Sequence, residues 1–446
     1  MIVKADTNPS RVVKGGARIT TTSLLLDALI DARTVELQLL DSLTDAQMLG
    51  ARAHFVEPPI WEMGHVGWFQ EYWILRHLDG ADSLLSGSDG IYDSFHVSYT
   101  RRWDHRYPSR DATCAYIADV LRRSIDRLEV REPSGEETYF YTLAALHEDM
   151  HAESLTQIFQ THGYRLPTLS LMKDTTTPPV DPSYQPRDVE VPGGTFVLGA
   201  DPSEPFVFDN EKWAHPVEVE RFRISSTPVT NAEFQAFVDD DGYGRRELWG
   251  RRGWDWRRRI GAEHPVFWVR GADDRWYVRQ FDRVVPLDPW YPVVHVNWYE
   301  AEAFCCWKGR RLPTEAEWEM AATLDPATGQ KRRFPWGDEP PTPERANLDY
   351  RAGGTIDVRA LPEGDSPVGC RQMIGNVWEW VRDTFAPYPG FVVDPYAEYS
   401  QPYFGEKKVL RGGAWTTRSR LIRGTWRNFY KRQRRNILAG FRTVAL

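Results

Sequence analysis

The strongest constraint on the fold is a change of residue pattern near residue 165. Between residues 23 and 163, apolar residues recur every three or four positions and long stretches are nearly free of glycine, which is typical of amphipathic helices. Beyond residue 187, short apolar stretches are broken by Gly, Pro, Asn and Trp, which indicates short elements and irregular connections. A chain of 446 residues with two such patterns is expected to fold as two or more units with their own cores.

The first part of the chain is predicted to form a four-helix bundle. Pro58 and Pro59 stand where the second helix would begin, a position that proline tolerates in the first turn of a helix. The four predicted helices span residues 24–43, 59–78, 112–128 and 136–163. Amphipathic helices of this length pack around a shared core, and chemistry in such a bundle is built between facing helices.

A segment rich in Pro, Asp and Thr, LPTLSLMKDTTTPPVDPSYQP, favours an extended connection and marks a domain boundary. The predicted organisation is an N-terminal extension (1–22), the bundle (23–165), a linker (166–186) and a C-terminal domain (187–446). Within the C-terminal domain, helices are predicted only around Asn231 to Asp239, Trp298 to Lys308 and Thr314 to Thr323. The predicted fold class is therefore a four-helix bundle followed by an irregular α+β domain.

Composition narrows the class of partner. A net charge of -8 gives no electrostatic reason to expect nucleic acid, so a small-molecule substrate is the better expectation. No run approaches 18 apolar residues, and Asp27 and Asp31 interrupt the apolar stretch near the start, so no membrane partner and no signal peptide are predicted. Four cysteines in 446 residues do not suggest a disulfide framework, and we expect a cytoplasmic protein.

The segment HEDMHAE contains the most informative spacing in the chain. His147 and His151 are four residues apart, so on a helix they lie about 40° apart and about 6 Å along the axis, and both imidazoles can reach one ion. They share the apolar stripe that should face the bundle interior, where an unpartnered imidazole is unfavourable. His65 lies on the aromatic face of the second helix and is the candidate third ligand, with a hydrogen-bonded core histidine as its alternative.

The same segment also matches HExxH, in which Glu148 would act as the general base of a zinc hydrolase. Three imidazoles with open positions suit Fe(II), Zn(II) or Cu, so ligand type alone does not choose the metal. A non-catalytic module with a structural metal is disfavoured, because structural sites are usually closed by four protein ligands. Glu153 lies about 200° around the helix from His151, so we predict a hydrogen-bonding role near the ligands and not metal binding.

The second part of the chain carries ordered motifs that resemble the formylglycine-generating-enzyme (sulfatase-modifying-factor) domain, a C-type-lectin-like fold. They include VPGGTFVLG (191–199), TPVTNAEFQAFV (227–238), GRRLPTEAEWEMAA (309–322), GNVWEW (375–380), VLRGGAW (409–415) and AGFR (439–442). The formylglycine generators carry a catalytic cysteine pair after the RGGSW motif, whereas this chain has no cysteine after Cys370. Formylglycine chemistry is therefore disfavoured.

A DinB-like bundle with HxxxHxE and an upstream histidine, followed by such a domain, resembles the ergothioneine sulfoxide synthases and their selenoneine synthase relatives. The resemblance implies an O2-dependent non-heme Fe(II) enzyme that joins a small sulfur or selenium donor to the imidazole of hercynine (trimethylhistidine). It implies His65, His147 and His151 as iron ligands. A selenosugar is the alternative to a cysteine or γ-glutamylcysteine donor. A zinc hydrolase is the remoter alternative function.

The resemblance also implies further site residues. The segment PYPGFVVDPYAEYS makes Tyr396 the first and Tyr399 the second candidate for a catalytic tyrosine, and RNF implies Asn428 and Phe429 in the betaine pocket. A trimethylammonium group cannot donate hydrogen bonds, so aromatic faces and oxygen dipoles suit it.

Two positions depart from the mycobacterial-type members. Met150 replaces a substrate-binding glutamine, and Tyr430 replaces an acidic residue, which argues against γ-glutamylcysteine as donor. Arg101 and Arg102 are candidates for binding a donor carboxylate. Structural calcium near Asn376 is a further expectation, because the related domain often binds it at this motif.

Overall fold

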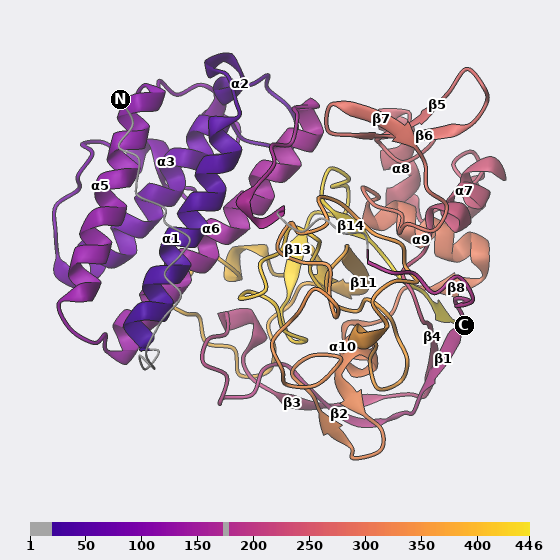
Figure 1. Cartoon of the computed structure of the whole chain (residues 1–446). Coiled ribbons are helices and arrows are strands. Elements are labelled where there is room, and N and C mark those ends of the chain that lie inside the picture. The colour runs from indigo at the N-terminus through magenta and orange to yellow at the C-terminus, as the bar shows by residue number, and fades with distance from the viewer. Residues whose placement is uncertain (1–19, 173–177) are drawn as a thin grey trace.

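The computed structural model describes residues 20–172 and 178–446. Figure 1 shows the helical half and the C-terminal half packed side by side, with the segments of β13 and β14 near the junction. The predicted extension 1–22 falls outside the described residues except for its last three, and the first helix begins at Thr21. Part of the predicted linker, residues 173–177, also lies outside them.

The prediction of four long helices in the first part of the chain is confirmed. They are α1 (Thr21–Asp41), α3 (Pro59–Gln70), α5 (Arg110–Glu129) and α6 (Gly135–His162). The α1 helix packs along α6, and α3 packs against both α5 and α6. Short helices fill the connections: α2 (Asp45–Leu49), α4 (Asp89–Tyr92) and the 3-10 turn η2 (Arg101–Trp103). Within the described residues, no helix combines the length and apolar character that a membrane crossing requires.

Helix α6 has clear start and stop signals. Ser134 caps its N-terminus and exchanges hydrogen bonds with Glu137, and Gly163 ends it with a φ of 71°, a left-handed conformation that favours glycine. Helix α3 differs from the prediction, because it ends at Gln70 and continues as a π-helix, η1 (Glu71–His77). Such wider turns interrupt helices most often at functional sites.

The C-terminal half is built from small sheets joined by long irregular segments. One four-stranded sheet has the order β1 (Asp188–Val191), β4 (Phe222–Ser225), β15 (Val444–Ala445) and β8 (Arg310–Arg311). The other has the order β13 (Asn428–Tyr430), β12 (Lys408–Arg411), β11 (Trp378–Thr384) and β14 (Ala439–Gly440). Smaller sheets contain β5 (Trp268–Arg270), β6 (Trp276–Gln280) and β7 (Arg283–Pro286), β2 (Gly194–Leu198) and β3 (His215–Val219), and β9 (Leu324–Asp325) and β10 (Gln330–Lys331).

Three predicted helices of this half are present, and a fourth was missed. The predicted ones are α7 (Asn231–Asp239), α9 (Trp298–Lys308) and α10 (Glu315–Thr323). The missed helix is α8 (Arg251–Ile260), whose sequence RRGWDWRRRI has five arginines and only three large apolar side chains. It is held by tertiary contacts, since Trp256 is buried and its ring lies 6.3 Å from that of Trp249. Short 3-10 turns complete the half: η3 (Ser170–Met172), η4 (Asp209–Glu211), η5 (Arg246–Leu248), η6 (Pro362–Gly364) and η7 (Gln401–Tyr403).

Candidate metal centre

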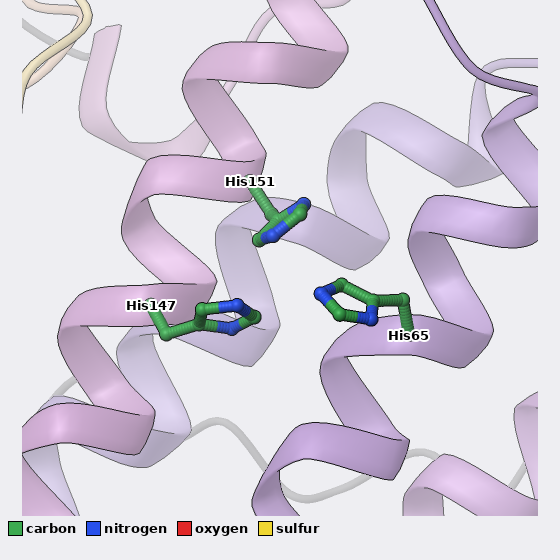
Figure 2. Close-up of side chains that lie close together, drawn as sticks. All are labelled: His65, His147 and His151. Atoms are coloured by element: carbon green, nitrogen blue, oxygen red, sulfur yellow. The ribbon is translucent and has the colours of Figure 1, made fainter. Parts of the chain in front are cut away.

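Helices α3 and α6 bring His65, His147 and His151 together. Each histidine offers one ring nitrogen, and these nitrogens lie within 4.8 Å of one another. Figure 2 shows the three rings pointing into one space, His65 from α3 and the other two from successive turns of α6. Among the described residues, this is the one group of three or more His, Cys, Asp or Glu side chains with metal-binding spacing.

Neighbouring groups hold the three rings in place. The Nδ1 atom of His65 lies 2.7 Å from the backbone oxygen of Tyr92, and Nδ1 of His151 is hydrogen-bonded to the buried carboxylate of Glu62. The ring of Phe69 stacks on that of His147 at 3.5 Å, and the ring of Trp61 stacks on that of His65 at 4.5 Å. Hydrogen bonds at Nδ1 orient an imidazole so that its Nε2 can act as a ligand.

The chemistry of this donor set fits a divalent transition metal. Burial, reinforced by His151, lowers the pKa of both His65 and His147 well below the usual value, which favours the neutral form that binds metals. Nδ1 of His147 is buried and has no hydrogen-bond partner among the described residues. Within residues 20–172 and 178–446 no fourth protein ligand joins the three imidazoles, which leaves positions open for other molecules, as in catalytic sites.

Glu148 is buried in the core of the bundle, where an arginine of α1 holds its carboxylate. Its carboxylate pairs with Arg33 of α1 at 2.5 Å, and the two side chains are 2% and 3% exposed. The Arg33 guanidinium also donates to Gln70 and to the backbone oxygen of Ile117. A carboxylate held in this way is not available as the general base that the HExxH interpretation requires.

Glu153 points to the C-terminal half. Its carboxylate accepts hydrogen bonds from Trp378 Nε1 at 2.7 Å, Thr416 Oγ1 at 2.9 Å and Thr417 Oγ1 at 2.8 Å. It makes no salt bridge within the described residues, and burial raises its pKa. The side chain therefore joins the helix that carries two of the histidines to the second half of the chain.

Two more charged contacts join the bundle to the C-terminal half. Asp149, which is buried, binds Arg420 through two hydrogen bonds of 2.6 Å. Asp31 of α1 also accepts a hydrogen bond from Arg420 at 2.7 Å. Charged contacts thus fix how the bundle sits on the C-terminal half.

The segment 394–400 carries both candidate tyrosines against the bundle. The ring of Tyr396 lies 4.9 Å from that of Phe69 and 6.1 Å from that of His147. Burial raises the pKa of Tyr396, so its phenol keeps its proton at neutral pH. Of the two candidates, Tyr396 is the one with a ring contact to a proposed metal ligand.

This segment is anchored at both ends. Asp394 forms a salt bridge with Lys212 at 2.6 Å and accepts a hydrogen bond from Tyr139 of α6 at 3.2 Å. Ser400, which is fully buried, is hydrogen-bonded to Asp209 and accepts a hydrogen bond from Asn210. The sequence had no signal for these anchors, because their partners lie more than 180 residues away.

Met150 faces the second candidate tyrosine. The hydroxyl of Tyr399 donates to the Met150 sulfur at 3.7 Å, and the Tyr399 ring lies 4.5 Å from that of Phe208. Burial raises the pKa of Tyr399 as well. The thioether therefore has a hydroxyl partner from the C-terminal half.

The predicted betaine-pocket residues lie on strand β13. Phe429 is 7% exposed, and its ring lies 4.0 Å from that of Phe385 and 5.6 Å from that of Tyr399. The Asn428 side chain accepts a hydrogen bond from the Phe429 amide. Tyr430, at the end of the strand, lies 4.6 Å below the guanidinium of Arg434. These residues are connected to the histidine cluster through Tyr399 and Met150.

The arginines predicted for a donor carboxylate are placed differently. Arg102 is buried, pairs with Glu57 at 2.5 Å and lies over the Trp61 ring at 3.9 Å, so its charge is already neutralised. Arg101 is exposed. Two cations that the sequence did not single out, Lys407 and Arg434, lie nearer to Phe429 and Tyr430.

The geometry at Asn376 gives no support for calcium. Its amide oxygen accepts from Asn347 at 3.1 Å and from the Ile356 backbone at 2.9 Å. Its amide nitrogen donates to Gln372 at 2.7 Å and to the backbone oxygen of Ile356. Protein groups already use the side chain that the expectation relied on.

Comparison with known proteins accounts for both halves. Residues 28–163 match the DinB superfamily model, and residues 174–445 match the sulfatase-modifying factor enzyme 1-like domain. The chain is 39% identical to the hercynine oxygenase of Mycobacterium tuberculosis over 428 residues, covering 95% of this chain and 99% of the relative. It is 38% identical to that of Mycolicibacterium thermoresistibile, covering 96% of each chain. A formylglycine-generating enzyme of Streptomyces coelicolor is 33% identical, covering 52% of this chain and 81% of the relative.

Proposed function

Because the chain belongs to the hercynine oxygenase family, we propose that it uses O2 to join a small sulfur or selenium donor to the imidazole of hercynine. The observation that carries the proposal is the convergence of His65, His147 and His151 in a chain that matches these oxygenases over nearly its full length. The three imidazoles would hold Fe(II). When bound, the iron supplies open coordination positions and the redox chemistry that O2 requires.

The proposed reaction balances as follows for a thiol. The imidazole loses a C–H hydrogen, the donor loses its S–H hydrogen, and a C–S bond forms between them. One oxygen atom of O2 is added to the sulfur and the other leaves as water, so the two substrates supply the four electrons that reduce O2. The product is a sulfoxide.

Tyr396 is the residue that we assign to proton control. Its half-buried ring lies against Phe69 and His147, and its phenol stays protonated at neutral pH, so the hydroxyl can donate a hydrogen bond or a proton close to the metal centre. The anchors at Asp394 and Ser400 restrict the motion of this segment. Rigid positioning of a proton donor is worth more than its presence alone.

The trimethylammonium group of hercynine is assigned to the Phe429 face. A quaternary ammonium gains from aromatic faces and from oxygen dipoles, and Phe429, Tyr399, Tyr403 and the Asn428 carbonyl oxygen supply both. Phe429 is buried and the other three residues are half-buried, and limited access of water strengthens electrostatic contacts at such a surface.

Two residues bear on the identity of the donor. Relatives that use γ-glutamylcysteine are expected to carry a glutamine and an acidic residue where this chain has Met150 and Tyr430. We therefore propose cysteine or a selenosugar as the donor. The Tyr430 phenol cannot supply the negative charge that an acidic residue would offer to the amino group of a γ-glutamyl donor, and the Met150 thioether cannot replace the hydrogen bond of a glutamine to the imidazole.

The test is product analysis with the iron-loaded enzyme. The protein is purified without O2, loaded with Fe(II), and given hercynine with cysteine, γ-glutamylcysteine or a selenosugar under air. We expect O2 consumption that depends on hercynine and, with the thiol, a product heavier than the two substrates combined by one oxygen and lighter by two hydrogens. Activity only in the zinc-loaded protein, with hydrolysis and no O2 consumption, would contradict the proposal.

A further inference from the structure

Lys407 and Arg434 are two half-buried cations that lie against aromatic rings in the C-terminal half. The Nζ atom of Lys407 lies 3.3 Å from the centre of the Tyr403 ring and 5.0 Å from that of Phe429. The guanidinium of Arg434 lies 4.6 Å from the centre of the Tyr430 ring and donates to Gln157 of α6 at 3.2 Å. Neither side chain makes a salt bridge with any residue that the structure describes, and both are half-buried.

The buried arginines of this half pair with acids, whereas the buried Lys408 donates to a backbone oxygen. Arg411 lies between Glu315 and Glu319 at 2.8 and 2.5 Å, and Arg442 binds Glu379 at 2.7 Å. Arg427 binds Glu315 at 2.7 Å. Removing a positive charge from water without a partner is unfavourable, so two half-buried cations that lie near each other without a salt bridge are suited to an external anion.

Strand pairing brings the two cations to the same place. In the ladder between β12 and β13, Lys408 pairs with Tyr430 and Val409 with Phe429, so Lys407 stands beside the end of β13. Arg434 follows four residues after Tyr430. Burial, and then the charge of Arg434, lower the pKa of Lys407 to about 7, which is the effect expected of cations that share one small region.

The same region adjoins the metal centre. Phe429 contacts Tyr399, whose hydroxyl donates to the sulfur of Met150, the residue before His151. Gln157, which Arg434 contacts, lies on the same helix as the two histidines. The region around Phe429 and Arg434 is therefore linked by side-chain contacts to the helix that carries His147 and His151.

We propose that Lys407 and Arg434 together bind the carboxylate of an amino-acid-derived substrate beside the aromatic faces of Phe429 and Tyr430. This inference rests on the proposed function and names the residues that recognise the acid group. The carboxylate could come from hercynine, whose trimethylammonium group we assign to the neighbouring aromatic faces, or from an amino-acid donor. A planar guanidinium and a point-like ammonium are well suited to share one carboxylate.

The test measures binding with and without the acid group. Calorimetry on the Fe(II)-loaded protein without O2 compares hercynine with its decarboxylated counterpart, trimethylhistamine, and cysteine with cysteamine. The variants are Lys407→Met and Arg434→Met, which keep apolar length, and Lys407→Arg, which keeps the charge. Lys431→Met is the matched control, because Lys431 is exposed and already pairs with Glu406 at 3.0 Å.

We expect each Met variant to weaken binding of one acid by at least about tenfold and to leave binding of its decarboxylated counterpart unchanged. Lys407→Arg and Lys431→Met should bind the acid nearly as the unchanged protein does. Loss confined to hercynine assigns the carboxylate to hercynine, and loss confined to cysteine assigns it to the donor. If hercynine and cysteine bind equally well to all variants, the inference is overturned.

The unchanged protein provides a second measurement that needs no variant. If it binds each acid no more tightly than the decarboxylated counterpart, the inference fails even where a variant does not fold. If it does not bind hercynine, the proposed function fails, and this outcome can be told apart from failure of the inference alone. Iron content and thermal unfolding of each variant report whether the fold is intact.

Discussion

The bundle and the C-terminal half build their parts of the site in different ways. In the bundle, two regular helices carry all three histidines, and the spacing of His147 and His151 follows from one turn of α6. In the C-terminal half, the candidate residues come from the segment 394–400, the end of β12 and the strand β13. One turn of a single helix sets two of the three metal ligands, whereas the surface that faces them is assembled from distant segments.

This difference assigns separate tasks to the two halves. The bundle's ligands depend on local helix geometry, so they should tolerate changes in the other half. The substrate surface depends on strand pairing and on contacts between the halves, so it should respond to changes that leave the metal untouched. Variants in each half can test whether the tasks are divided in this way.

The largest effect is expected in the bundle. His147→Ala removes one of three ligands, so we expect the loss of bound iron and a fall in activity of at least about a thousandfold, measured by metal analysis and O2 consumption. His96→Ala is the control, because His96 is exposed in the same half. An iron-replete, active His147→Ala protein would show that the metal lies elsewhere.

The next effect concerns the junction. Glu153→Ala leaves Trp378, Thr416 and Thr417 without their shared acceptor, so we expect the free energy of unfolding to fall by about 3 kcal/mol in denaturant titrations. Glu136→Ala, at an exposed position of the same helix, should change it by less than about 0.5 kcal/mol. Equal stability of the two variants would remove Glu153 from the interface argument.

Tyr396→Phe tests the C-terminal contribution to chemistry. Loss of a positioned proton donor is expected to lower kcat about a hundredfold while iron content and hercynine affinity stay nearly unchanged. Tyr399→Phe is the matched variant in the same segment, and we expect it to lower kcat less than tenfold. Steady-state kinetics and product analysis separate the two, and the reverse ranking would transfer the role to Tyr399.

Phe429→Ala tests the aromatic surface. Removing a face for the trimethylammonium group should weaken hercynine binding about tenfold, since each 1.4 kcal/mol is one decade in affinity. Iron content should not change, because the ring touches none of the three histidines. Phe95→Ala, at an exposed position of the bundle, serves as control in the calorimetry. Normal affinity would leave β13 with a scaffold role.

The smallest effect is a pH dependence. Burial and the charge of Arg434 lower the pKa of Lys407 to about 7, so the free protein loses this ammonium as the pH rises through 7. The charges that face Lys407 are Arg434, Glu406 and Lys431. We expect the Kd for the bound acid to rise about fivefold between pH 7 and 8, as the protonated fraction falls. The slope should flatten in Lys407→Met, whereas an identical slope in both proteins would contradict the role.

The bundle could be predicted from the sequence because helix periodicity is a local signal. The apolar period located α1, α3, α5 and α6, and the four-residue spacing made His147 and His151 a ligand pair before any contact was known. The π-helix after Gln70 was not predicted, because its wider turn depends on tertiary packing and not on a distinct residue pattern. Helix α8 was missed because its few apolar residues stand among five arginines, and the burial of Trp256 became evident only in the folded chain.

The sequence by itself determined the two-part organisation, the family and the candidate metal ligands, since each depends on residue types at short spacing or on ordered motifs. Only the tertiary structure decided which charges are free. Arg102 looked like a carboxylate binder until Glu57, 45 residues away, was found to neutralise it, and Lys407 and Arg434 became candidates because no described acid pairs with them. The physical reason is that a charge is neutralised by whatever lies within a few ångströms, and chain order does not specify that neighbour.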